Sequence, residues 1–284
     1  MEFKEFDMTE YFEVLNSFKE ENREIIIKQY GSIEKYDEFI ERCKTNQDKI
    51  AKDAVEEYGS MEKFVDSLKK NFSNEKYMSL SEKFDEYRQD LIEDNNPKLR
   101  KLLDKLFSYK DKGQSSKEVQ EIATKITELS KKEYEVFKMK DGDDHWFSIV
   151  NVYKNMKEET KKLNKQFGEF DKLYGEGACN FFGNALNLNM NGWEPEGEKL
   201  YKRLTADLTK DPANEDLQDI IEKIINVERE SYKSLDMEMP ENHYPHKAEL
   251  FQNNETYIKV FDDKYGKGAS KFIGKALEIY INNK

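Results

Sequence analysis

The sequence predicts an all-α protein in which an N-terminal helical segment precedes two tandem helical repeats. Proline and glycine are scarce, with 5 and 13 in 284 residues, as expected for a chain with few strands and turns. One stretch with apolar residues at helical spacing occurs twice, and further matching residues precede both copies. Aromatic residues make up 13% of the chain, which argues against disorder despite the high charge.

The repeated stretch covers residues 170–191 and 261–282, which are separated by 91 positions. Eleven of the twenty-two aligned residues are identical, and each copy contains two glycines that lead into an amphipathic helix. Gly175 and Gly177 can adopt positive φ at low cost, which suits a sharp turn between helices. Because Gly183 lies on or near the apolar face, we expect another helix to approach closely there.

Upstream of this stretch, the matching residues are separated by 98 positions. They include Pro97 and Pro195, Gln120 and Gln218, and His145 and His243. The separation changes between Tyr153 and Phe170, so the first copy carries seven extra residues there. We therefore predict an internal duplication, with an N-terminal segment over 1–95 and two repeats over 96–191 and 192–284. Each repeat is large enough for its own core.

The expected helices follow from apolar periodicity and from the residues that start and stop helices. In the N-terminal segment, Gly31-Ser32 and Gly59-Ser60 each combine a helix-ending glycine with a capping serine. The expected ranges there are 8–30, 33–44, 48–58, 61–71 and 75–94. Those of the first repeat are 97–109, 116–139, 145–167 and 177–190, and those of the second are 195–208, 214–235, 246–263 and 268–282.

Charge and composition argue against several classes of function. The net charge of −12 disfavours direct nucleic-acid binding, because such binding needs a basic face for phosphate contacts. No N-terminal apolar region and no eighteen-residue apolar run occur, so we expect no membrane association and a cytoplasmic location. Two cysteines make no disulfide framework, and we expect Cys179 to be a buried structural residue.

The sequence offers little for catalysis or cofactor binding. His243 and His246 could place two imidazoles near one metal, but Pro245 lies between them and no third ligand is near. We favour a packing or capping role for these histidines and expect no cofactor. Because the sequence lacks a phosphate-binding loop, a nucleophile elbow and a convergent acid–base set, we do not expect an enzyme.

Aromatic residues are the better candidates for a binding site. Trp146 and Tyr244 occupy equivalent places, each after a histidine where a loop enters a helix, and Trp193 marks the junction of the repeats. Aromatic faces with polar edges suit large, flat ligands, although core packing is the alternative for each of these residues. The candidate ligand-binding residues are Tyr134, His145, Trp146, Phe147, Tyr153, Trp193, Tyr232, His243, Tyr244 and Phe251.

The start of the chain, residues 2–39, resembles the TipA-type antibiotic-recognition (TipAS) domains, which are the drug-binding halves of some MerR-family regulators. The resemblance is carried by Phe3, Phe6, Asp7, Tyr30-Gly31-Ser32, Tyr36, Glu118-Val119-Gln120, Tyr153 and the 177–185 pattern. It implies a globin-like all-α fold for each repeat, with helices that enclose a ligand cleft. The tandem arrangement is similar to drug-sequestering members such as albicidin-binding proteins.

Two departures from the family pattern affect what the resemblance implies. No basic winged-helix domain precedes residue 1, so we do not expect direct promoter binding. The family's thiopeptide-bonding cysteine would lie near residues 137–140, where this chain has Met139, so we do not expect covalent capture.

We therefore expect a non-catalytic protein that binds and sequesters an amphipathic small molecule, with a peptide antibiotic as the favoured ligand. The alternative is a fragment of a ligand-sensing transcriptional regulator that acts through a protein partner. Sequestration needs no partner, whereas the regulator needs one.

Overall fold

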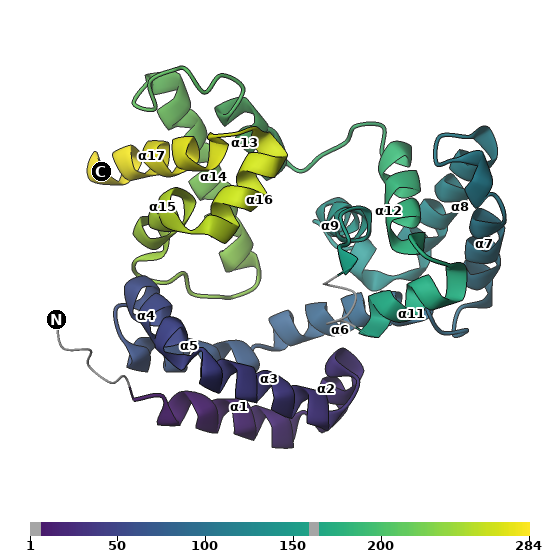
Figure 1. The fold of residues 1–284 in the computed structure, drawn as a ribbon, viewed down its shortest axis with the longest axis horizontal. Helices are drawn as coiled ribbons and strands as arrows, with labels where there is room; N and C mark the ends of the chain where they lie inside the picture. Colours follow the sequence, from purple (N-terminus) through teal and green to yellow (C-terminus); the bar gives the residue numbers. More distant parts are fainter. Residues whose placement is uncertain (1–6, 159–164) are drawn as a thin grey trace. The chain divides into compact units, whose positions relative to one another are not determined.

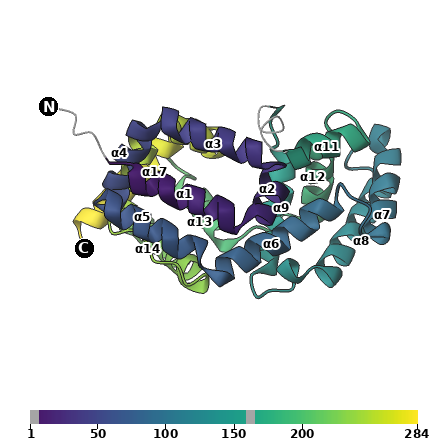
Figure 2. The same cartoon turned by 90° about the horizontal axis from the view of Figure 1, so that it is seen from below.

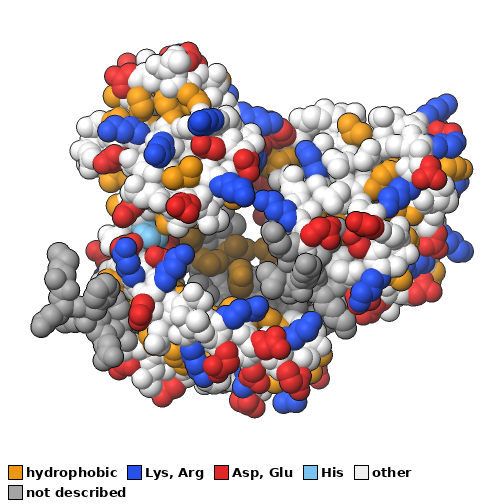
Figure 3. Space-filling view, viewed as in Figure 1, with side chains coloured by type: hydrophobic (Ala, Val, Ile, Leu, Met, Phe, Trp, Pro, Cys, Tyr) orange, Lys and Arg blue, Asp and Glu red, His pale blue; other side chains and the backbone are white. Residues whose placement is uncertain are grey.

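The computed structural model describes residues 7–158 and 165–284, in which helices are joined by turns and loops and no β-strand occurs (Figure 1). The prediction of an all-α protein is confirmed. None of the described helices is both long and apolar enough to span a membrane. On the face drawn in Figure 3, acidic and basic side chains are intermixed.

The chain forms two compact units, and the N-terminal segment contributes to both. The C-terminal unit contains residues Met1–Asn22, Tyr36–Tyr77 and Glu196–Lys284, and the central unit contains Arg23–Lys35 and Met78–Pro195. The domain boundaries expected after residues 95 and 191 stay a prediction.

The central unit is built around a core of helices that follow Pro97. Its elements are α2 (Arg23–Tyr30), most of α6 (Glu75–Asp90), α7 (Pro97–Ser108), η1 (Lys110–Lys112), α8 (Lys117–Glu133), η2 (Glu135–Phe137), α9 (Gly142–Lys154), α11 (Lys165–Tyr174) and α12 (Ala178–Asn189). Helix α12 packs against α9 and α8. Large buried side chains such as Trp146, Phe170 and Phe182 fill the space between these helices.

The C-terminal unit has a second apolar core. Its elements are α1 (Thr9–Glu21), most of α3 (Ile33–Thr45), α4 (Gln47–Tyr58), α5 (Met61–Phe72), α13 (Glu196–Leu204), α14 (Glu215–Ser234), α15 (His243–Asn253), α16 (Glu255–Tyr265) and α17 (Ala269–Asn282). Helix α17 packs against α14, α15 and α16, and α13 packs against α14. Ile221, Ile225, Phe251 and Ile273 are among the buried residues of this core.

Helix α1 lies alongside α3 and α5 (Figure 2). The rings of Phe18 and Phe72 stack with centroids 4.2 Å apart, and the Tyr36 hydroxyl donates to the Leu15 carbonyl at 3.2 Å. The expected glycine–serine turn before α5 is confirmed, because Gly59 has a φ of 83° and Ser60 Oγ accepts from Lys63 N–H. These contacts hold the N-terminal helices to one another.

The glycine turns before α12 and α17 have the same construction. Gly177 and Gly268 have φ values of 75° and 91°, which confirms the expected positive φ at this turn. The Asp262 carboxylate accepts from the N–H groups of Gly268 and Ser270 at 2.8 and 2.9 Å, and Asp171 makes the equivalent bonds before α12. A carboxylate at a helix N-terminus satisfies free N–H groups and interacts favourably with the helix dipole.

Two glutamines matched in the sequence also make matching hydrogen bonds. Gln218 Nε2 donates to the carbonyls of Pro212 at 2.7 Å and Ala276 at 3.1 Å. Gln120 Nε2 makes the corresponding bonds to Gln114 at 2.7 Å and Ala185 at 3.1 Å. The hydrogen bonding of the two groups of helices thus follows the sequence repeat, while their origin by duplication stays a prediction.

The close helix approach expected at Gly183 is confirmed. A Cβ atom on Gly183 would lie 2.0 Å from the backbone nitrogen of Lys154 at the end of α9. A Cβ atom on Gly274, the matching residue of α17, would lie 2.8 Å from the Ala248 carbonyl oxygen and 2.9 Å from Phe251 Cβ on α15. Both crossings therefore require glycine.

Four expected helices differ from the structure. The one expected over 116–139 ends at Glu133, because Tyr134 is extended, and the short helix η2 follows it. The helix expected over 8–30 is interrupted at Asn22, between α1 and α2. The one expected over 246–263 is two helices, because Asn254 accepts hydrogen bonds from Thr256 and Tyr257 N–H and so caps a new helix, α16. The helix expected over 145–167 ends at Lys154.

Some expectations concern residues outside the described ranges. Phe3 and Phe6, which contribute to the family resemblance, are among residues 1–6. Residues 159–164 belong to the segment between Tyr153 and Phe170, where the seven extra residues are expected.

The glycine crossings predict a specific sensitivity to one added methyl group. We expect Gly274→Ala to lower the free energy of unfolding by about 1–3 kcal/mol, because Ala248 and Phe251 would have to move. Denaturant unfolding of the full chain measures this change. Gly197→Ala is the matched control, because its Cβ would meet only Val227 Cγ1 at an ordinary 3.7 Å. Equal unfolding midpoints for the two variants would contradict the close crossing.

The carboxylate at the second glycine turn predicts a loss of stability on truncation. We expect Asp262→Ala to cost about 0.5–2 kcal/mol, because two backbone N–H groups lose their acceptor. Asp263→Ala removes an exposed neighbouring carboxylate and should leave the melting temperature nearly unchanged. If the two variants melted alike, the Asp262 cap would contribute nothing.

Candidate functional site

The ten candidate ligand-binding residues belong to both units. Those in the central unit are Tyr134, His145, Trp146, Phe147, Tyr153 and Trp193, and those in the C-terminal unit are Tyr232, His243, Tyr244 and Phe251. Tyr134, Trp146, Tyr153 and Phe251 are buried in the two cores, whereas Trp193 is 38% exposed. The structure therefore places four of the ten where they pack the protein, and a binding role for any of them stays a prediction.

Trp146 lies in a cluster of aromatic rings in the central unit. Its ring meets those of Phe137 and Tyr87 edge to face, with centroids 5.0 and 6.0 Å apart. The indole Nε1 of Trp146 and the hydroxyl of Tyr153 are buried and have no hydrogen-bond partner among the described residues. Both rings therefore pack in the core, and the Trp146 N–H and the Tyr153 hydroxyl donate no hydrogen bond to the described residues.

The other candidates of the central unit lie around the start of α9. His145 Nδ1 is 3.0 Å from the Val136 carbonyl oxygen, and Nε2 is 3.3 Å from Asp141 Oδ2. This histidine therefore ties α9 to η2 and the turn that follows it. Phe147 meets the ring of Trp193 edge to face at 6.3 Å.

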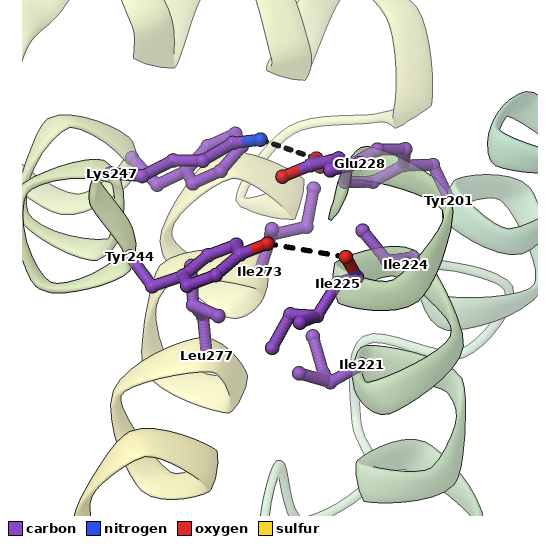
Figure 4. Close-up of a pocket in the computed structure, with 10 residues that line it drawn as sticks. Tyr201, Ile221, Ile224, Ile225, Glu228, Tyr244, Lys247, Ile273 and Leu277 are labelled. Atoms are coloured by element: carbon purple, nitrogen blue, oxygen red, sulfur yellow. Dashed lines mark hydrogen bonds and ion pairs between the residues drawn. The ribbon is translucent and has the colours of Figure 1, made fainter. Parts of the chain in front are cut away.

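The C-terminal unit contains a small apolar pocket between α13, α14, α15 and α17 (Figure 4). Its volume is about 10 Å³, which is room for about one water molecule. Two of the candidate residues, Tyr244 and Phe251, are part of its wall. The lining residues are Tyr201, Ile221, Ile224, Ile225, Glu228, Tyr244, Lys247, Phe251, Ile273 and Leu277.

One end of this pocket is polar. Glu228 on α14 forms an ion pair with Lys247 on α15, and the same carboxylate oxygen accepts from the Tyr201 hydroxyl at 3.2 Å (Figure 4). The second oxygen, Oε2, is buried and has no hydrogen-bond partner among the described residues. Burial, together with the nearby Glu228 carboxylate, raises the pKa of Tyr201 well above its usual value, so its hydroxyl remains a donor at neutral pH.

Tyr244 spans the pocket wall from the other side. Its hydroxyl donates to the Ile225 carbonyl at 3.2 Å, and the Arg229 guanidinium lies over its ring, 5.6 Å from the centroid. Burial and then the Glu228 carboxylate raise the pKa of Tyr244 to about 12. The ring thus presents an apolar face while its hydroxyl is fixed by a backbone carbonyl on α14.

The two histidines of α15 face carboxylates of the N-terminal helix α4. His243 Nδ1 is 3.1 Å from Glu57 Oε1, and its Nε2 is 3.9 Å from Glu228 Oε2. His246 Nδ1 is 3.7 Å from Glu56 Oε2. Next to them, Asn242 N–H donates to the Glu57 carbonyl at 3.0 Å. His243 therefore connects α4 with the polar end of the pocket.

Metal binding by the histidine pair has no support in the described residues, which contain no group of three or more His, Cys, Asp or Glu side chains able to hold a metal ion. Both histidines of the pair lie against glutamates of α4 instead. The packing or capping role favoured for them stays a prediction. Cys179 is buried, as expected for a structural cysteine.

The positions of the central unit that match the pocket are occupied differently. A separation of 98 pairs Glu228 with Ser130 and Lys247 with Ile149, so the ion pair has no counterpart there. Tyr87 of α6 lies close to this place, because its hydroxyl is 3.4 Å from Ser130 Oγ and its ring meets that of Trp146. Of the two matched places, the one in the C-terminal unit therefore has the partly buried charged groups.

Two of the ten lining residues, Tyr244 and Phe251, are among the candidates predicted from the sequence. The charged pair Glu228 and Lys247 and its neighbour Tyr201 are not. Tyr201, Glu228 and Lys247 were not singled out, because tyrosine, glutamate and lysine are common in this chain. The repeat itself contained a signal, since charged residues replace small or apolar ones at two matched positions of helical faces. That comparison would have pointed to α14 and α15.

The family model of the TipAS antibiotic-recognition domain matches residues 187–280. No curated protein and no solved structure gives a match to the chain. The matched range contains every residue that lines the pocket. Over residues 187–280, about a third of its length, the chain is therefore similar to the TipAS antibiotic-recognition domain.

Proposed function

We propose that the C-terminal unit captures an amphipathic small molecule, with a peptide antibiotic as the favoured ligand, and holds it without changing it chemically. The observation that supports this most directly is the pocket inside the antibiotic-recognition domain, which combines an aliphatic floor with one polar end. Ligand sites of proteins commonly have this composition, with a few polar groups that orient a largely apolar ligand.

A ligand larger than water requires the pocket to open. Tyr244 and Lys247 are the partly buried lining residues on the short helix α15, so we expect the pocket to open on their side when the Tyr244 hydrogen bond and the Lys247 ion pair break. Ile221, Ile225 and Ile273 form the buried floor. Opening on that side would expose this floor to the ligand while the four helices keep their places.

The chemistry of the lining supports binding without reaction. The charged side chains Glu228 and Lys247 are paired with each other, and the hydroxyls of Tyr201 and Tyr244 both donate to oxygens of the protein. The raised pKa values of both tyrosines keep them protonated at neutral pH and therefore poor as bases or nucleophiles. We expect mass spectrometry to recover a bound antibiotic unchanged after prolonged incubation.

Sequestration by the chain alone is the form of this function that we propose. It requires that the purified protein bind its ligand in solution at a defined ratio, without any partner. A ligand-sensing regulator would instead show ligand-dependent association with another protein.

Truncation of the pocket wall provides the test. We expect Tyr244→Ala to weaken binding of an antibiotic that binds the wild type at least tenfold, because removing an aromatic anchor from a desolvated site costs about 2 kcal/mol or more. Isothermal titration calorimetry against thiopeptide and linear peptide antibiotics measures the affinity.

The control for this test is Tyr280→Ala. Tyr280 also has a hydrogen-bonded hydroxyl, which donates to Glu222 at 3.1 Å, but it does not line the pocket. Its truncation should leave the affinity within about twofold of the wild type. If both variants bound equally well, or if no antibiotic bound the wild type, the proposal for this pocket would be wrong.

A further inference from the structure

The two carboxylate oxygens of Glu228 differ in their hydrogen bonding. Its Oε1 accepts from Lys247 Nζ and from the Tyr201 hydroxyl, whereas its buried Oε2 accepts no hydrogen bond from the described residues. The imidazole Nε2 of His243 lies 3.9 Å from Oε2, which is too far for a hydrogen bond. A buried carboxylate oxygen that accepts no hydrogen bond from the protein is unfavourable, so a ligand group that donates to it gains binding energy.

Glu228 is one of the residues that line the apolar pocket, at its polar end. The residue lies on α14 one turn beyond Ile224 and Ile225, both of which line the same wall (Figure 4). A ligand that covers these isoleucines and reaches Glu228 would therefore pack its apolar part on the floor of the pocket and place a group at its edge next to the carboxylate.

The charge balance at this end selects a neutral donor. The Glu228 carboxylate is already neutralised by Lys247, so a ligand cation would add an uncompensated positive charge beside that lysine. A ligand carboxylate would meet Glu228 itself and be repelled. An N–H or O–H group of an amide, indole or phenol adds a hydrogen bond without changing the charge.

On these grounds we infer that Glu228 is a specificity-determining residue of the pocket, and that it selects ligands in which a neutral N–H or O–H donor is attached to an aromatic or aliphatic body. This inference rests on the proposed function, because it assumes that the same pocket takes the ligand. It adds the chemical class of group that the pocket recognises.

The full-length protein allows a direct test with two bicyclic probes of nearly the same shape. Indole carries an N–H donor, and benzofuran has an oxygen at the same place. Four isoleucines line the pocket, namely Ile221, Ile224, Ile225 and Ile273, so labelled isoleucine methyl groups report binding there by NMR titration. We expect indole to bind about tenfold more tightly than benzofuran, because a hydrogen bond to a charged acceptor stabilises more than one to a neutral group.

Substitution of the carboxylate identifies the group responsible. Glu228→Gln should bring the affinities for indole and benzofuran within about twofold of each other. Glu222→Gln is the matched control, because Glu222 lies on the same helix but pairs with Lys284 outside the pocket. It should leave the tenfold preference unchanged.

The outcomes separate the inference from the proposed function. Equal affinities in the wild type, or no indole-dependent shift of the four methyl groups, would overturn the role of Glu228 even if Glu228→Gln failed to fold. In that case, an antibiotic that shifts the same methyl groups would leave the proposed function standing. If neither the antibiotics nor the bicyclic probes shifted them, the pocket proposal and this inference would both fall.

Discussion

The C-terminal unit depends on the close crossing of α17 and α15 at Gly274. The Ala248 carbonyl and the Phe251 Cβ occupy the space where a side chain at this position would lie. Such an approach fixes the rotation of α17 about its axis, because only one face of the helix can come so close. Ile273 and Leu277, which flank the glycine, consequently face the pocket. The geometry of the site thus follows from the absence of one methyl group.

The two units differ in how the matched positions around Ser130 and Glu228 are filled. In the central unit, Ser130, Ile149 and Trp146 pack with Tyr87, and their surroundings are a continuous apolar cluster. In the C-terminal unit, the matched positions have Glu228 and Lys247, which must be paired to be tolerated at this depth. The small pocket of this unit lies beside the ion pair.

Much of the fold could be predicted from local signals, because the repeat, the glycine turns and the helix ends are encoded within a few residues. Gly177 and Gly183 are examples, since positive φ and close approach are properties of glycine itself. The sequence did not predict the break between α15 and α16, because the apolar periodicity continues across Asn254 although this residue caps the second helix. The site was only partly predictable. Trp146 and Tyr244 have equivalent sequence positions, yet one is 1% exposed and the other partly exposed, a difference set by distant residues such as Tyr87.

The contact between α4 and α15 has a consequence for how the protein is made. Glu57 binds Asn242 N–H and lies beside His243, so its partners are synthesised more than 180 residues later. A ribosome adds about 5–20 residues per second, so α4 waits for many seconds before that surface exists. Contacts of such long sequence separation also slow folding, because a large loop must close before they form. Helix α4 is therefore exposed on this side until α15 has been made, and a fragment limited to residues 187–280 would leave the α4-binding face of α15 uncovered.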